Sequence, residues 1–219
     1  MGGADGSTAF LLLFFRRGRV DLPDERRLAL PSVVKSSPFA YRRPMTTRSA
    51  PASLAEAAPF DSRELRDTLG RFATGVTVVT ALAPNGMAIG LTVSSFNSVS
   101  LEPPLILWSL SADSPNREAF EAAHYYAVNV LAAAQADVSN QFAARLADKF
   151  EGVDWRPGVG GAPLLSGCCA WFEVKNTQRV AGGDHLIFIG EVVGIDRDPS
   201  RAPLLFHDGR YRLLGDAPL

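Results

Sequence analysis

Residues 90–111 read GLTVSSFNSVSLEPPLILWSLS, a stretch in which small hydroxyl groups interrupt an otherwise apolar strand pattern. Apolar runs flank its first half, GVTVVTAL upstream and PPLILWSL downstream. Five hydroxyl-bearing residues lie between these runs: Thr92, Ser94, Ser95, Ser98 and Ser100. A hydroxyl that is buried without a hydrogen-bond partner costs about 1–3 kcal/mol. These groups therefore either bond to one another or face a polar ligand.

The segments around this stretch predict short strands that are joined by tight turns. The expected strands are 75–83, 87–96, 105–111, 125–132, 168–180, 186–198 and two short strands around the HDG turn at 207–209. PNG at 84–86 makes a hairpin of the first two, and SLEPP (100–104) is expected to be a loop. Strands that are linked mainly by hairpins indicate a mainly β fold, an antiparallel, Greek-key-like barrel.

A few helices are expected at the periphery of this barrel, over 62–73, 114–124 and 136–148. Leucine and phenylalanine recur at helical spacing in the first and the third. In the second, we place Ser114 at the N-cap and Pro115 at the first helical position, where its missing N–H costs nothing.

The composition is that of a globular protein with a sizeable core. The chain has 219 residues, of which 47% are hydrophobic, and its net charge of −1 does not indicate a nucleic-acid partner. Residues 1–48 differ from the rest, with nine Lys or Arg against four Asp or Glu. We expect 1–58 to be a poorly ordered N-terminal extension, with Met45 as an alternative start, and 59–219 to be the folded domain.

Cysteine content and hydropathy bear on the compartment. The only cysteines, Cys168 and Cys169, are adjacent, so a disulfide framework within one chain is excluded and a reducing compartment, the cytoplasm, fits best. The apolar run AFLLLFF at 9–15 is far shorter than the ~20 residues of a membrane span, so no membrane association is expected.

Several common site types have no signature here. The chain contains neither a G-x-G-x-x-G after a strand, nor a P-loop, nor a G-x-S-x-G elbow. Its histidines, His124, His185 and His207, lack metal-ligand spacing, and we expect no metal site.

Hydroxyl groups next to a helix start are the feature left to explain. Ser109 and Ser111 end a strand that runs into the predicted helix at Ser114-Pro115-Asn116. Free N–H groups at a helix start can bind phosphate, and Thr92, Ser94 and Ser95 could present their hydroxyls to the same ligand. The alternative is that these hydroxyls bond across the sheet or stabilise turns.

The order of motifs resembles the flavin reductase family, the small reductase components of two-component flavin-dependent monooxygenases. The matching segments are RFATGVTVVT, GLTVSSFNSVSLEPPLILWSL, YYAVNVL, FAARLADKFEGVDW, GDHLIFIGEVV and PLLFHDGRY, which together cover roughly residues 60–215. The resemblance implies an FMN-binding split barrel, usually a homodimer. It also implies that NADH or NADPH reduces FMN or FAD, and that the reduced flavin passes to a partner monooxygenase.

The resemblance also implies site residues. Flavin-binding positions match Ala88, Ile89, Gly90, Leu91, Thr92, Ser94, Ser95, Ser109, Leu110, Ser111, Pro115, Asn116, Gln141 and Phe142. The nicotinamide side of the pocket is similar to Phe206, His207, Asp208 and Gly209, with His185 as the catalytic candidate. Many of these contacts are expected through the backbone.

Two other functions remain open at this point. One is a split barrel that holds FMN or haem without turnover, and the other is an enzyme like pyridoxamine-phosphate oxidase. The HDG and GDH segments favour the reductase, because the resemblance places them in a nicotinamide pocket.

Overall fold

A seven-stranded antiparallel sheet dominates the structure, a computed structural model that describes residues 59–215. Its strand order is β3-β2-β6-β9-β10-β5-β4. The strands are β2 (Thr77–Leu82), β3 (Ala88–Val93), β4 (Asn97–Leu101), β5 (Pro104–Ser111), β6 (Tyr125–Val130), β9 (Ala170–Gly182) and β10 (His185–Arg197). The predicted N-terminal extension and the alternative start at Met45 lie outside the described residues.

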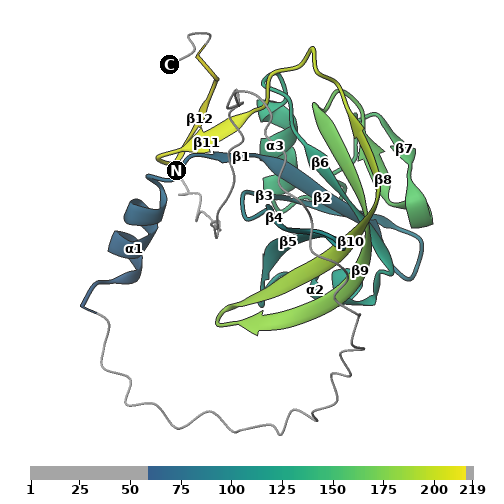
Figure 1. The fold of residues 1–219 in the computed structure, drawn as a ribbon, viewed down its shortest axis with the longest axis horizontal. Helices are drawn as coiled ribbons and strands as arrows, with labels where there is room; N and C mark the ends of the chain where they lie inside the picture. Colours follow the sequence, from purple (N-terminus) through teal and green to yellow (C-terminus); the bar gives the residue numbers. More distant parts are fainter. Residues whose placement is uncertain (1–58, 216–219) are drawn as a thin grey trace, which may run out of the picture. The chain divides into compact units, whose positions relative to one another are not determined.

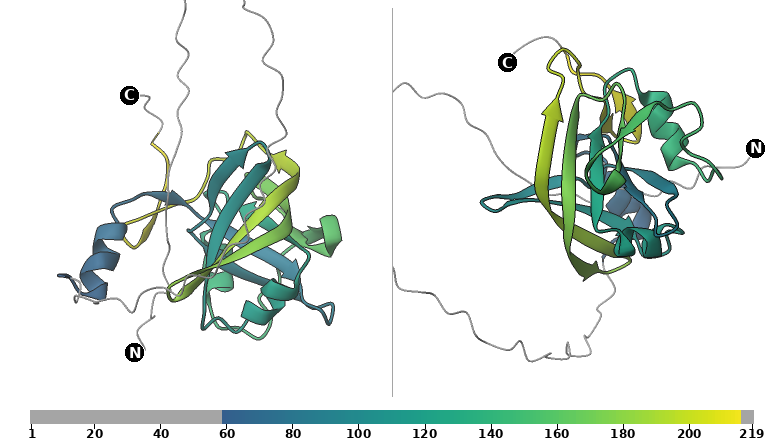
Figure 2. Two further views of the ribbon diagram at one scale, coloured as in Figure 1. Left: turned by 60° about the horizontal axis from the view of Figure 1, so that its bottom comes forward. Right: turned by 90° about the vertical axis from the view of Figure 1, so that its right-hand side faces the viewer.

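The sheet curls around one core, which makes it a barrel (Figures 1 and 2). Trp108 of β5 stacks on Phe188 of β10 with ring centroids 4.5 Å apart, and Phe120 of α2 (Arg117–Ala122) meets Trp108 edge-on at 5.2 Å. Burying one such side chain stabilises the fold by roughly 1.5–3 kcal/mol. β3 and β4 end the strand order without pairing with each other, so the barrel is split. The mainly β split-barrel prediction is confirmed.

A second core lies between the outer face of β2 and β3 and the helix α3 (Ala136–Ala143). Phe142 of α3 is fully buried there, against Gly90 of β3. A Cβ on Gly90 would lie 2.6 Å from a ring carbon of Phe142, so only glycine permits this close approach. Figure 1 shows α3 alongside this part of the sheet.

A small sheet of order β1-β11-β12 adjoins the barrel. It consists of β1 (Thr74–Gly75), β11 (Leu205–His207) and β12 (Arg210–Arg212). Its base is tied to the barrel because Val76 N donates to Leu204 O at 3.1 Å and Leu204 N donates to Leu131 O at 2.9 Å. The remaining elements are α1 (Ser62–Leu69) and the pair β7 (Trp155–Pro157) and β8 (Pro163–Leu165), which flank a 3-10 turn at Val159–Gly161.

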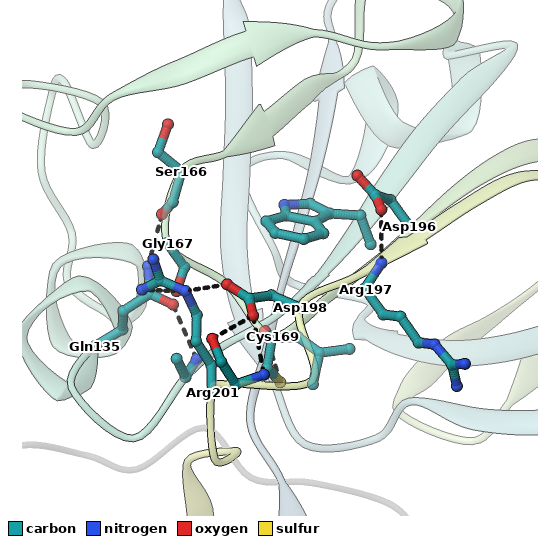
Figure 3. A network of polar contacts seen from close by, with 12 residues as sticks. Gln135, Ser166, Gly167, Cys169, Asp196, Arg197, Asp198 and Arg201 are labelled. Carbon is teal, nitrogen blue, oxygen red and sulfur yellow. Dashed lines mark hydrogen bonds and ion pairs between the residues drawn. The ribbon is translucent and has the colours of Figure 1, made fainter.

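A polar network fastens the end of β10 to the loops beside it (Figure 3). The Asp198 carboxylate accepts from Arg201 Nε at 2.7 Å and from the Ser200 backbone N–H at 3.0 Å. Arg201 also donates to Gly167 O at 3.3 Å, and Gln135 Nε2 donates to Ser166 O at 2.9 Å. The Ser200 and Arg201 hydrogen bonds hold the pKa of Asp198 below its usual range. The network therefore joins three segments that are distant in sequence.

The two cysteines are free and lie just before β9. Cys168 is fully buried, and burial raises its pKa to about 12. Cys169 is half-buried, and its Sγ donates to Val130 O at 3.4 Å. Cys168 thus packs as a small apolar core residue, and it precedes β9 although a strand was expected over 168–180.

The predicted helix boundaries are wrong in all three helices. α1 ends at Leu69, not at 73, because the chain tightens there into turns in which Arg71 N donates to Thr68 O at 3.1 Å and Phe72 N donates to Leu69 O at 3.0 Å. α2 begins at Arg117, not at Ser114, because the Ser114 hydroxyl accepts from Asn116 N at 3.3 Å in a local turn that competes with the helix. α3 ends at Ala143, not at 148. Lys149 Nζ folds back to donate to Phe142 O at 2.8 Å, which satisfies a carbonyl at the helix end.

The loop prediction over 100–104 is also wrong in part. Asn97–Leu101 forms β4, which pairs with β5 through partners such as Asn97 with Leu107 and Leu101 with Pro104. Because β4 is a largely exposed edge strand, it lacks the apolar alternation that would have identified it.

Gly90→Ala tests the contact between β3 and α3. The added methyl must displace the Phe142 ring, so we expect the free energy of unfolding to fall by about 1–3 kcal/mol in urea titrations. Gly75→Ala is the matched control, since a Cβ there meets nothing within 4 Å, and its effect should stay within about 0.5 kcal/mol. Equal effects of the two substitutions would contradict this packing.

Candidate functional site

The open edge of the sheet provides the backbone of the candidate site. Among the strands of residues 59–215, β3 pairs with β2 alone, so its other edge has backbone N–H and C=O groups that none of these strands pairs. The predicted residues Ala88, Ile89, Gly90, Leu91 and Thr92 all belong to this strand. Ser94 and Ser95 come directly after its end. Contacts to a ligand through the backbone, as the sequence predicts, are therefore available here.

Ser95 links the loop after β3 to β5. Its hydroxyl accepts from Ser109 N at 2.9 Å and donates to Ser109 O at 3.2 Å. On the other side of β5, Ser109 pairs with Ile187 and Ser111 pairs with His185. The structure therefore brings Ser95, Ser109, Ser111 and His185 together from three chain segments.

Not all hydroxyls in this group are free. The Ser95 hydroxyl is engaged by Ser109, and Ser111 Oγ accepts from Asp113 N at 3.4 Å. Within residues 59–215, the half-buried side chains of Ser94, Ser109 and Asn116 form no hydrogen bond through their polar side-chain atoms. These three side chains have all of their hydrogen-bonding groups available for a ligand.

Leu110 and Pro115 contribute differently from these polar residues. Leu110 is almost fully buried and belongs to the barrel core, so its side chain faces away from the outer surface where Ser109 and Ser111 lie. Pro115 is exposed in the turn before α2. Any contact of Leu110 with a ligand would therefore use its backbone.

His185 is oriented by its neighbour Asp184. The His185 Nδ1 lies 2.8 Å from Asp184 Oδ1, and the histidine side chain is 22% exposed. This hydrogen bond holds the pKa of Asp184 below its usual range, so the carboxylate is ionised at neutral pH. Because a carboxylate can only accept, Nδ1 carries the proton, and in the neutral ring Nε2 is an acceptor.

Side chains at the β3–α3 contact are engaged within the protein. Thr92 Oγ1 donates to Ser139 O at 2.7 Å, and Gln141 Nε2 donates to Lys149 O at 3.0 Å and to Glu151 O at 2.8 Å. Phe142 has no exposed surface. The structure therefore gives Thr92, Gln141 and Phe142 packing and anchoring roles. The fully buried Phe142 could meet a ligand only through its backbone.

The β11–β12 hairpin carries the predicted nicotinamide residues. Phe206 and His207 lie in β11, and Asp208 and Gly209 form the turn, with φ of +54° and +70°. Asp208 N donates to Gly70 O at 2.8 Å, which anchors the turn.

Sequence reasoning missed Ser139, Asn140 and Tyr211. The Tyr211 hydroxyl hydrogen-bonds to Ser139 Oγ and to Asn140 Oδ1, each at 2.8 Å, and so joins β12 to α3. Tyr211 does lie in the PLLFHDGRY segment, but nothing in the spacing of these residues reveals the contact. Asp184 was also missed, although it precedes His185 in the GDH motif.

The described residues hold neither a metal-binding cluster nor a membrane-spanning helix. Within 59–215, no group of three or more His, Cys, Asp or Glu side chains could hold a metal ion. None of the helices there has the length and apolar character needed to span a bilayer.

A comparison with known protein families assigns the chain to one of them. The profile of the Flavin reductase like domain matches residues 69–215, which contain every site residue discussed above. The chain belongs to the flavin reductase family. Within this flavin reductase domain, the resemblance that the sequence suggested is confirmed.

Curated relatives carry related names. A "Probable flavin reductase" of Rhizobium meliloti is 50% identical over 137 residues, which are 63% of this chain and 44% of the relative. The "FMN reductase (NADH) SmoA" of Agrobacterium fabrum is 43% identical, covering 69% of this chain and 85% of the relative. The "Flavin-dependent monooxygenase, reductase subunit HsaB" of Mycobacterium tuberculosis is 38% identical, covering 70% and 83%. The chain thus spans less than half the length of the first of these relatives.

A solved structure resembles the flavin reductase domain closely. The NADH:FAD oxidoreductase of Streptomyces globisporus, in complex with NAD and FAD fragments, superposes with a TM-score of 0.68 at 41% sequence identity. The match covers 71% of this chain and 94% of that chain. This agreement supports the split-barrel assignment.

Proposed function

We propose that the chain is an NADH-dependent flavin reductase, which reduces FMN or FAD and supplies the reduced flavin to a monooxygenase. One observation carries the proposal: the hydroxyls of Ser94 and Ser109, which have no hydrogen-bond partner within residues 59–215, lie beside the end of the open strand β3 and next to the strand that carries the oriented imidazole of His185. Relatives named as an NADH-dependent FMN reductase and as a monooxygenase reductase subunit support it.

The donor set fits a flavin. A flavin presents a phosphate, ribityl hydroxyls and a ring edge that carries both donors and acceptors. Ser94, Ser109 and Asn116 would hold the phosphate or the ribityl chain, because hydroxyl, amide and backbone N–H groups can bind an anion without lysine or arginine. The unpaired edge of β3 would meet the ring edge, and Gly90 keeps the strand in place against α3.

His185 would act on the nicotinamide side. When bound, NADH and the flavin supply the redox chemistry, a hydride transfer between their rings. The Asp184 carboxylate fixes the His185 tautomer, so that Nε2 would accept a hydrogen bond from an amide group such as a carboxamide. The β11–β12 hairpin, with Phe206 and Asp208, would form the opposite wall and exclude water.

A second copy of the chain would pack against the exposed face of α1 and form a homodimer. None of the eight residues of α1 is buried, and Leu65, Phe72 and Leu213 are exposed by 37%, 44% and 69%. An isolated eight-residue helix is unstable in water, so α1 needs tertiary or quaternary packing. We assign this packing to a homodimer, as the resemblance implies.

The activity is tested with FMN and NADH added to the purified full-length protein. We expect NADH absorbance to fall only when FMN or FAD is present, with NADPH as the comparison nucleotide. The same preparation without flavin, and flavin with NADH but without protein, are the controls. Flavin binding without nucleotide oxidation, by either NADH or NADPH, would leave a non-catalytic flavin binder.

Ser94→Ala combined with Asn116→Ala should weaken flavin binding about tenfold in a fluorescence titration, because two candidate ligand contacts are lost. The melting temperature should not change, since neither side chain has a hydrogen-bond partner within the described residues. Ser95→Ala is the contrasting variant and should lower the melting temperature, because both Ser109 backbone groups lose a partner. Unchanged flavin affinity in the double variant would place the flavin elsewhere.

The assembly is tested by light scattering coupled to gel filtration, where we expect twice the chain mass. Leu65→Glu places a charge on the α1 face and should shift the population towards monomer. Met87→Glu is the control, because Met87 is 60% exposed beside the β2–β3 turn, and should leave the mass unchanged. A monomeric wild-type protein would contradict the dimer.

A further inference from the structure

Tyr211 fastens the β11–β12 hairpin to α3 by both its ring and its hydroxyl. The hydroxyl bonds to Ser139 Oγ and Asn140 Oδ1 at 2.8 Å each. Its ring lies edge-on to Phe206, with centroids 5.8 Å apart, and the two residues face each other across the hairpin. Tyr211 lies in β12, which pairs with β11. Its contacts with α3 therefore also hold β11, the strand that carries Phe206 and His207.

Ser139 continues this connection to β3. The residue is fully buried, and while its side chain bonds to Tyr211, its carbonyl accepts from Thr92 Oγ1 at 2.7 Å. One residue of α3 thus hydrogen-bonds to both β12 and β3. The connection runs from the hairpin assigned to the nicotinamide side to the strand assigned to the flavin.

The other contacts that hold the β11–β12 hairpin lie at its base and at its tip. Leu204 attaches the base of β11 to Val76 and Leu131. At the tip, Asp208 bonds to Gly70 O and pairs with Arg71 at 3.6 Å, both side chains of this ion pair being more than half exposed. An exposed pair of this kind contributes little. Among these ties, the Tyr211 hydroxyl is the one that orients the hairpin against α3.

We propose that Tyr211 is a positioning residue, which sets the distance between the nicotinamide wall and the flavin strand by way of Ser139. This inference rests on the proposed function. Hydride transfer requires the reacting atoms to approach within about 3–3.5 Å, and a displacement of about 1 Å can reduce the rate about a hundredfold. The hydroxyl would therefore influence turnover although it need not touch either nucleotide.

Tyr211→Phe removes the hydroxyl and keeps the ring against Phe206. We expect kcat/KM for NADH to fall at least fivefold, about the effect of losing one or two hydrogen bonds, while the flavin dissociation constant stays within twofold. Asn140→Ala removes one of the two bonds and should have a smaller effect of the same kind. Tyr125→Phe is the matched control, because the Tyr125 hydroxyl has no hydrogen-bond partner within 59–215, and it should change neither quantity.

A second measurement does not depend on activity. Hydrogen exchange of the backbone amides in 205–212 should be faster in Tyr211→Phe than in the wild type or in Tyr125→Phe. If exchange is unchanged, or if flavin affinity falls as much as kcat/KM, the positioning role is wrong. If the wild-type protein does not oxidise NADH but exchange still increases in Tyr211→Phe, the tether stands and the proposed function fails.

Discussion

The Ser95 hydroxyl forms hydrogen bonds with β5 that the backbone of a paired strand would normally form. The candidate site depends on this side-chain hydrogen bonding. A strand residue opposite Ser109 would normally bond to its N–H and C=O with its own backbone. Here the side chain does so instead, at 2.9 and 3.2 Å. The chain can then turn from β3 into β4 without joining the two, which leaves the barrel split at this point. A backbone pair here would instead extend the β4–β5 ladder, in continuation of its register of Asn97 with Leu107.

The hydroxyl groups of the hydroxyl-rich stretch fall into two sets, one of which bonds within the protein, the second of the alternatives that the sequence left open. Thr92 and Ser95 bond to backbone groups and hold the structure together. Ser94 and Ser109 lie next to them, with hydroxyls that have no partner within residues 59–215. The protein-bonded hydroxyls fix the backbone that presents the others. A pocket that is organised before its ligand arrives loses less conformational entropy on binding.

The sequence predicted the strands and the fold class well because alternation and tight turns are local signals. PNG, GGDH and HDG each lie at a hairpin turn of the structure. The ends of α2 and α3 were not predictable, because each is decided by a side chain that bonds back to the backbone, Ser114 in one case and Lys149 in the other. The hydroxyl groups beside the start of α2 were found from the residue pattern, and the other candidate site residues came from the resemblance. The tether at Tyr211 depends on tertiary contacts between residues 139 and 211. No local pattern encodes such a contact.

The turn between β9 and β10 limits how the chain length can vary. His185 is the first residue of β10, directly after Gly183 and Asp184, and Gly183 has a φ of +73°. Both strands extend for 13 residues from this turn, and Phe188 must face the barrel interior. A shift of β10 by one residue against β5 and β9 would exchange the two faces of the strand, turning the imidazole inward and the phenylalanine outward. A change in the length of this turn should therefore be found only where a longer loop or a bulge keeps the register of β10 with both neighbours.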